Sequence, residues 1–183
     1  MLFKHRFIVF SGMLGLMVFN VVSHADVLDL GLSNDLAVLS YEMDNSKDFS
    51  TQVSILHADV DDHRSNYAAF GFATRQDSGK FRPRLGARIF GLDGEGSSSA
   101  YGIALTAGAD VIIKPKLSIN FDAAYAPNIL TGGDFDHYYE LTADCSYQLI
   151  KNGALYLGFR KNQAVSPGYK VYQGAVLGVR FTL

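Results

Sequence analysis

The sequence has one cysteine, Cys145, and no tryptophan among its 183 residues. A single cysteine excludes an internal disulfide and any zinc site built from several cysteines. Proline occurs only 4 times, and the formal net charge is -2 with no run of basic residues. A mildly acidic chain without a basic patch does not suggest a nucleic-acid partner.

Long apolar runs are also lacking beyond the first 25 residues. A membrane-spanning helix needs about 20 consecutive apolar residues, so the rest of the chain cannot cross a membrane as a helix. An open sheet in hydrocarbon would leave backbone groups without hydrogen bonds. If this part of the chain enters a membrane, it must therefore do so as a closed β-barrel.

The first 25 residues have the three parts of a secretory signal. Lys4 to Arg6 is basic, 7–22 is apolar and uncharged, and Ser23-His24-Ala25 places small residues at the two positions that a signal peptidase reads. The alternative is an N-terminal membrane anchor, for which the apolar run is short. We expect a signal peptide at 1–25, cleaved after Ala25, followed by one domain at 26–183.

Hydrophobic residues alternate with polar or small ones along most of this domain, which is typical of antiparallel strands. In the clearest run, Leu117 to Ala126, residues such as Phe121 share one face and Asn120 and Asp122 the other. The run from Thr51 to Val60 is ambiguous, because either face is partly apolar. The pattern predicts ten strands, with eight as the alternative, at about 27–32, 35–43, 51–60, 66–74, 83–92, 99–110, 117–126, 137–150, 154–162 and 170–183.

The composition of the two faces indicates which one meets lipid. The polar face is rich in Gly, Ala and Ser with isolated charges of both signs, whereas a water-facing sheet usually carries more Lys, Glu and Thr. A narrow barrel interior needs small residues and paired charges, because side chains must fill it. We therefore predict an all-β fold, a single antiparallel up-and-down transmembrane barrel, with an interior charge network of Arg84, Arg88, Asp122, Glu140, Asp144, Arg160 and Arg180.

Other features agree with an outer-membrane location. Tyr101, Tyr125 and Tyr139 lie near strand ends, as in an interfacial girdle. The final run places Val171, Ala175, Leu177, Val179, Phe181 and Leu183 on one apolar face. Outer-membrane barrels commonly end in such a strand, which the barrel assembly machinery reads. The expected partners are outer-membrane lipid and that machinery, the expected state is a monomer, and no cofactor or metal is expected.

The chain also resembles a known family from Ala87 onward. The resemblance is carried by Ala87-Arg88-Ile89-Phe90-Gly91-Leu92-Asp93-Gly94-Glu95-Gly96, by the Gly/Ala-rich run from Tyr101, and by Leu117 to Tyr125 closing on Ala126-Pro127. These segments are similar to the YfaZ family of small outer-membrane proteins. The resemblance implies a barrel of similar size and brings no catalytic residues with it.

A non-enzymatic barrel with a structural or surface-interaction role and a plugged polar interior is the favoured function. Three alternatives stay open: a lipid-modifying outer-membrane enzyme, a narrow small-solute pore, and a soluble periplasmic ligand-binding barrel. The residues that an enzyme would use are His57, His63, His137, Asp61, Asp62, Asp136 and Ser65. Their spacing defines no nucleophile, base and acid set, and a solvated acidic loop explains them as well.

Overall fold

The computed structural model describes residues 26–60, 63–94, 99–165 and 170–183. The expected signal peptide at 1–25 lies outside this part of the chain, as do Asp61, Asp62, Glu95 and Gly96. No helix among the described residues is long and apolar enough to span a membrane.

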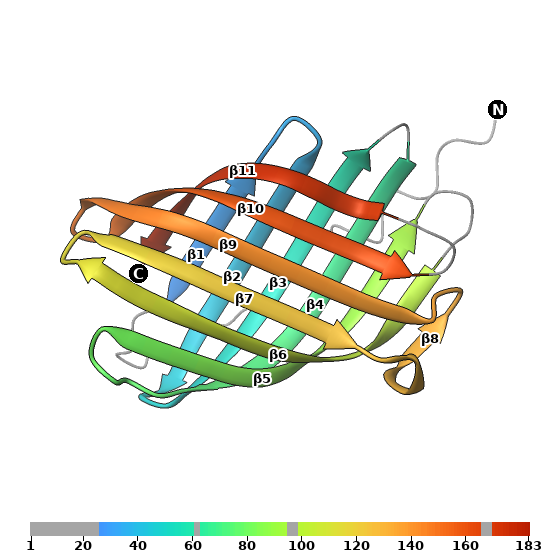
Figure 1. Ribbon diagram of the computed structural model, residues 1–183, viewed down its shortest axis with the longest axis horizontal. Coiled ribbons are helices and arrows are strands. Elements are labelled where there is room, and N and C mark those ends of the chain that lie inside the picture. The colour runs from blue at the N-terminus through green and yellow to red at the C-terminus, as the bar shows by residue number, and fades with distance from the viewer. Residues whose placement is uncertain (1–25, 61–62, 95–98, 166–169) are drawn as a thin grey trace.

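Ten strands close into one antiparallel barrel, and a short eleventh strand extends its rim (Figure 1). Each barrel strand pairs with its neighbours in the chain, and β1 closes the barrel by pairing with β11. The prediction of a ten-strand up-and-down barrel is therefore confirmed. The strands are β1 Val27–Leu32, β2 Leu36–Ser46, β3 Phe49–Val60, β4 His63–Arg75, β5 Phe81–Gly94, β6 Ser99–Lys114, β7 Leu117–Ala126, β8 Thr131–Gly133, β9 His137–Ile150, β10 Gly153–Val165 and β11 Lys170–Thr182.

The alternating apolar face points outward, away from the lumen. Phe121, Leu141 and Leu157 are 49%, 51% and 63% exposed, although each sits in the middle of its strand. A soluble barrel would bury these side chains in a shared centre, whereas a membrane barrel turns them to lipid. Their exposure on β7, β9 and β10 assigns the outer surface to hydrocarbon.

The two ends of the barrel differ. Both described termini lie at one end, where Leu183 N donates to Asp26 O (2.8 Å) and Thr182 N donates to Asn152 O (3.0 Å). We call this the terminal end, and the opposite end the loop end. The turns at 115–116 and 151–152 are at the terminal end, and the 127–136 connection is at the loop end.

The 127–136 connection folds back over the loop end. A short 3-10 helix, η1 Asn128–Leu130, leads into β8, which pairs with Ala100 to Gly102 of β6. Gly133 has a φ of 96°, a backbone conformation that favours glycine. Phe135 then turns inward and joins the buried apolar cluster of the barrel. The longest described connection therefore extends the wall beside β6 and places one aromatic side chain, Phe135, in the loop end of the lumen.

One residue of the last strand was predicted on the wrong face. Val171 was expected outward with Ala175, but it is only 1% exposed and packs inside. The reason is a register shift, in which Asn162 pairs with Tyr172 while Gln163 pairs with Lys170. Val171 is the extra residue of this bulge, which reverses the alternation at the loop end of β11.

The loop-end half of the lumen is filled with apolar side chains. Every barrel strand except β1 contributes to one buried cluster, and its largest members are aromatic. The rings of Tyr67, Phe90 and Tyr138 stack on one another, with centroids 6.1, 5.7 and 4.8 Å apart. We call these three residues the aromatic plug. Small residues predominate around them, as expected of a narrow interior.

Candidate functional site: a charged cavity in the terminal half of the lumen

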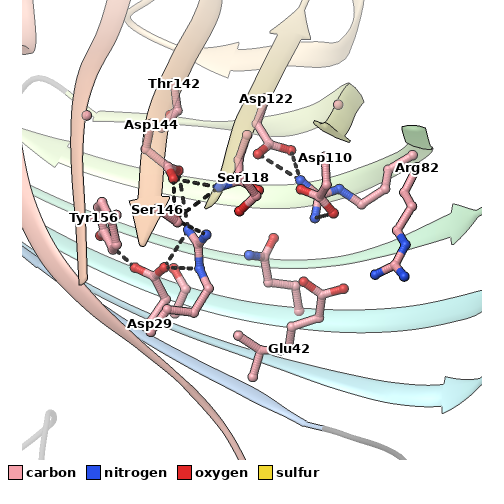
Figure 2. A pocket seen from close by; sticks show the side chains of 18 of the residues that line it. Asp29, Glu42, Arg82, Asp110, Ser118, Asp122, Thr142, Asp144, Ser146 and Tyr156 are labelled. Atoms are coloured by element: carbon pink, nitrogen blue, oxygen red, sulfur yellow. Dashed lines mark hydrogen bonds and ion pairs between the residues drawn. The ribbon is translucent and has the colours of Figure 1, made fainter. Parts of the chain in front are cut away.

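The terminal half of the lumen contains a cavity of about 560 Å³. Its wall is polar and apolar in about equal parts and comes from all ten barrel strands, and it reaches Lys116 and Lys151 in the turns of the terminal end. Figure 2 shows Asp29, Glu42, Asp110 and Asp122 around the same open space. Arginines on the wall join these carboxylates into three clusters.

The first cluster is centred on Arg84 of β5. Its guanidinium contacts Asp122 of β7 through Nη2, 3.0 Å from either carboxylate oxygen, and Asp110 of β6 through Nη1 at 3.3 Å. Inward alternation on three adjacent strands brings these side chains together. Gly108, which pairs with both Arg84 and Asp122, leaves room for them, because a Cβ there would lie 2.3 Å from Asp122 Oδ1.

The second cluster is centred on Arg180 of β11. Arg180 Nη2 lies 2.8 Å from Asp29 Oδ2 and 3.3 Å from Asp144 Oδ2, so it joins β1 to β9. Asn120 and Ser146 both donate to Asp144 Oδ1, at 2.6 and 2.8 Å. These hydrogen bonds satisfy the most buried carboxylate of the cavity, and they fix its position.

Tyr156 joins the second cluster from β10. Its hydroxyl donates to Asp29 Oδ1 at 2.7 Å, and the Arg180 guanidinium lies 5.0 Å from its ring centroid. The ring lies over two glycines, Gly31 and Gly178, of the neighbouring strands. The absence of side chains at these two positions is what allows a tyrosine to lie flat against the wall.

The third cluster is centred on Arg75 at the end of β4. Arg75 Nη2 lies 2.5 Å from Glu42 Oε1 and 2.8 Å from Asp44 Oδ1, both on β2. All three arginines are thus shared between two carboxylates each. Such bridging gives every carboxylate a partner but leaves one negative charge in excess per cluster when all groups are ionised.

The floor of the cavity, toward the aromatic plug, has the opposite balance. Glu140 receives Arg88 Nη2 at 2.7 Å, and Arg160 Nη1 lies 3.8 Å from its other oxygen. Tyr138 and Asn162 also donate to Glu140, at 3.1 Å each. We call Arg88, Glu140 and Arg160 the ion layer. Glu140 is 7% exposed, so this carboxylate is held by charge-assisted hydrogen bonds away from water.

All seven residues predicted for the interior charge network lie on the cavity wall. The structure divides them: Arg84 with Asp122, Asp144 with Arg180, and Glu140 with Arg88 and Arg160. Five charged partners on the same wall were not predicted from the sequence, namely Asp29, Glu42, Asp44, Arg75 and Asp110. Each of them alternates with outward-facing neighbours on its own strand, and this alternation could have identified it as an interior residue.

Of the described residues considered for an enzyme, Ser65, His57 and His137 do not lie in one site. Ser65 is buried and faces inward, while His57 is exposed on the outer surface with its Nδ1 2.9 Å from Asn66 Oδ1. His137 lies on β9, with its ring centroid 6.3 Å from that of Tyr125. Across the described ranges, no group of three or more His, Cys, Asp or Glu residues is placed to hold a metal ion.

Comparisons with known proteins agree on family and fold. A family model described as YfaZ precursor matches residues 5–182. No curated protein matches the sequence. Among solved structures, a KdgM porin in complex with disordered oligogalacturonate has a TM-score of 0.50 and 12% identity, over 87% of this chain and 99% of that one.

Larger barrels also match. A bacterial polysaccharide outer membrane secretin has a TM-score of 0.48 and 11% identity over 85% of this chain, which spans 57% of that chain's length. An anion-selective porin from Comamonas acidovorans has a TM-score of 0.43 and 14% identity, over 81% of this chain and 49% of that one. The likeness to the KdgM porin, at 12% identity, concerns the barrel fold alone.

Proposed function

The chain belongs to the YfaZ family of exported outer-membrane barrel proteins, and from that premise we propose that it is a non-conducting barrel. Its role is structural or lies in surface interactions, and it is not that of an open channel. The observation that carries this proposal is the aromatic plug, in which Tyr138 is 0% exposed at the centre of the loop-end half.

Two successive barriers support the proposal. The aromatic plug and its apolar neighbours offer a passing hydrated solute few hydrogen-bonding groups, and the Tyr138 hydroxyl is already bonded to Glu140 and Asn162. Below them, an ion that crossed the ion layer would have to separate Glu140 from Arg88, which lie 2.7 Å apart with side chains 9% and 12% exposed. Breaking such a buried pair costs about 3–5 kcal/mol. Barrels of about eight to ten strands are usually filled in this way.

The outer surface supports the proposed partners. Exposed apolar residues cover the middle of the barrel, and the exposed Tyr101 and Tyr125 lie toward its loop end, so a lipid bilayer is the partner that fits this surface. The strand β11 presents Leu177 and Phe181 outward and is the segment through which we propose contact with the barrel assembly machinery. The proposed state is a monomer, because the barrel closes on itself and leaves no need for a second copy.

Planar-bilayer recording tests the proposal. The refolded protein is expected to insert without discrete conductance steps. A double variant that removes the plug, Phe90→Ala with Tyr138→Ala, is expected to give measurable steps, whereas the lipid-facing control Phe121→Ala stays silent. Heat-modifiable migration on a gel verifies that each variant has folded. Regular conductance steps in the unmodified protein would reject a sealed barrel and support the small-solute pore instead.

A further inference from the structure

We propose that the cavity in the terminal half of the lumen binds a small organic cation, one bearing an ammonium group. The ligand enters from the terminal end and donates hydrogen bonds to Asp110, Asp122 and Thr142. The family match and the fold comparisons assign no ligand to this chain, so the inference rests on the cavity wall.

The first argument is the charge of the wall. Each of Arg75, Arg84 and Arg180 is shared between two carboxylates, so the three clusters together carry an excess of three negative charges when all groups are ionised. These groups are partly shielded from bulk water, where the attraction between unlike charges is stronger than at the surface. The full lining, with the arginines of the floor and the basic residues of the mouth, holds nine basic and seven acidic side chains, so the negative excess is local to the three clusters. A cation bound beside these clusters compensates their excess, whereas an anion there adds to it.

The second argument is the acceptor capacity left on one side of the cavity. Asp122 is bound to Arg84 yet its side chain is 51% exposed, and it faces the open space in Figure 2. A carboxylate accepts about four hydrogen bonds, so both Asp122 and Asp110 retain acceptor positions beside their bonds to Arg84. An ammonium group, which has three donors and no acceptor, matches such positions.

The third argument is a buried hydroxyl that lacks a partner. Thr142 Oγ1 lies in the cavity wall with no hydrogen-bond partner among the described residues. Thr142 pairs across the sheet with Asp122, so its hydroxyl and that carboxylate are neighbours on the same face. A buried polar group without a partner costs free energy, and a ligand that bonds to it removes that cost.

An organic cation suits this site better than a metal ion. The carboxylates are spread around a volume of about 560 Å³, and within the described residues no three of them converge as ligands. The Arg88 and Arg160 guanidiniums at the floor repel a cation, which limits how deep it can enter. Lys114, Lys116 and Lys151 lie at the mouth, where water and salt screen their charges.

Isothermal titration calorimetry on the refolded full chain in detergent tests the inference. The probes are cadaverine, a five-carbon diammonium, and glutarate, a five-carbon dicarboxylate, both at about 0.15 M salt, where the lysines of the mouth are screened. We expect cadaverine to bind with one molecule per barrel and glutarate to give no binding heat. Cadaverine affinity is expected to fall about tenfold in Asp122→Asn, since the ammonium group then donates to a neutral oxygen in place of a charged carboxylate.

Two further variants keep the test decisive. Thr142→Val leaves the charge of the wall unchanged and is expected to weaken cadaverine binding, while the mouth control Lys116→Ala is expected not to weaken it. Heat-modifiable migration verifies folding of each variant. Equal or tighter binding of glutarate, no binding of cadaverine, or full affinity in both Asp122→Asn and Thr142→Val overturns the inference. Calorimetry measures ligand binding in the cavity, and bilayer recording measures conductance through the barrel. Either proposal can therefore fail without the other.

Discussion

Adding one methyl group at Gly178 is expected to destabilise the barrel substantially. An ideal Cβ at this position would lie 2.3 Å from Tyr156 Cζ, 2.4 Å from its hydroxyl oxygen and 2.5 Å from the backbone oxygen of Leu30. The Tyr156 ring must leave the wall, and the pairing of β1 with β11 must also shift, because the contact with the Leu30 oxygen is a contact with backbone. The ring then loses its hydrogen bond to Asp29 and its contact with Arg180.

The expected cost has two parts, the crowding by the added methyl group and the loss of the hydrogen bond from Tyr156 to Asp29. Forcing an extra methyl into a packed site costs about 1–3 kcal/mol, and a hydrogen bond to a charged group contributes about 1.5–3 kcal/mol. We expect Gly178→Ala to lower the free energy of unfolding by about 2.5–6 kcal/mol in total. Gly91→Ala is the matched control, because a Cβ at Gly91 meets nothing within 4 Å.

Urea titration of the barrel refolded into phospholipid vesicles measures this difference, with the folded fraction read from gel mobility. The control is expected to unfold within about 0.5 kcal/mol of the unmodified protein, as surface substitutions usually do. If Gly178→Ala and Gly91→Ala unfold at the same urea concentration, the close packing of the Tyr156 ring against Gly178 is contradicted.

Three further predictions use the same unfolding assay. Glu140→Gln leaves Arg88 and Arg160 without a buried counter-charge and is expected to cost about 3–5 kcal/mol; a loss under 1 kcal/mol would contradict the ion layer. Arg64→Ala removes an ion pair with Asp59 whose side chains are 70% and 48% exposed, so a change of at most about 1 kcal/mol is expected, and a larger one would be wrong for a solvated pair. Leu157→Arg places a charge on the lipid-facing surface and is expected to cost about 2–4 kcal/mol in vesicles, and an unchanged stability there would argue against burial in hydrocarbon.

Much of the barrel wall could be predicted from alternation alone. Residues such as Phe121 and Asp122 differ by one position, so the period of two assigns them to opposite faces without knowledge of the fold. The chemistry of the polar face then indicated which side is the lumen. The same reasoning predicted that all seven charged residues face the lumen, because the face of a residue follows from its position in the strand and does not depend on its ion-pair partner.

Position along the barrel axis could not be predicted in the same way. The alternation predicts that both Phe90 and Arg88 point inward from β5. It does not predict that Phe90 lies in the aromatic plug and Arg88 in the ion layer. The interior was therefore expected to be polar throughout, and its loop-end half is apolar. The run from Thr51 to Val60, in which either face is partly apolar, was the sign of this apolar half. Leu56 and Ala58 are buried in the interior beside the aromatic plug, while Ile55 faces outward.

Ion-pair partners also required the structure. Arg180 and Asp29 are 151 positions apart and meet only because β1 and β11 close the barrel. Asp110 reaches Arg84 through the register of β5 and β6, in which Arg84 pairs with Gly108. The bulge that buries Val171 arises from one extra residue against β10, and a strand pattern read alone does not contain its partner's register.

The single cysteine offers the most direct test of which face meets lipid. Cys145 is exposed on β9, on the same face as Leu141. A nitroxide attached to it in vesicles is expected to collide readily with molecular oxygen and hardly at all with a water-soluble nickel chelate. In the variant Cys145→Ser with Ser118→Cys, the label faces the cavity and is expected to show the reverse order. Free access of the nickel chelate to a label on Cys145 would contradict the account of this barrel.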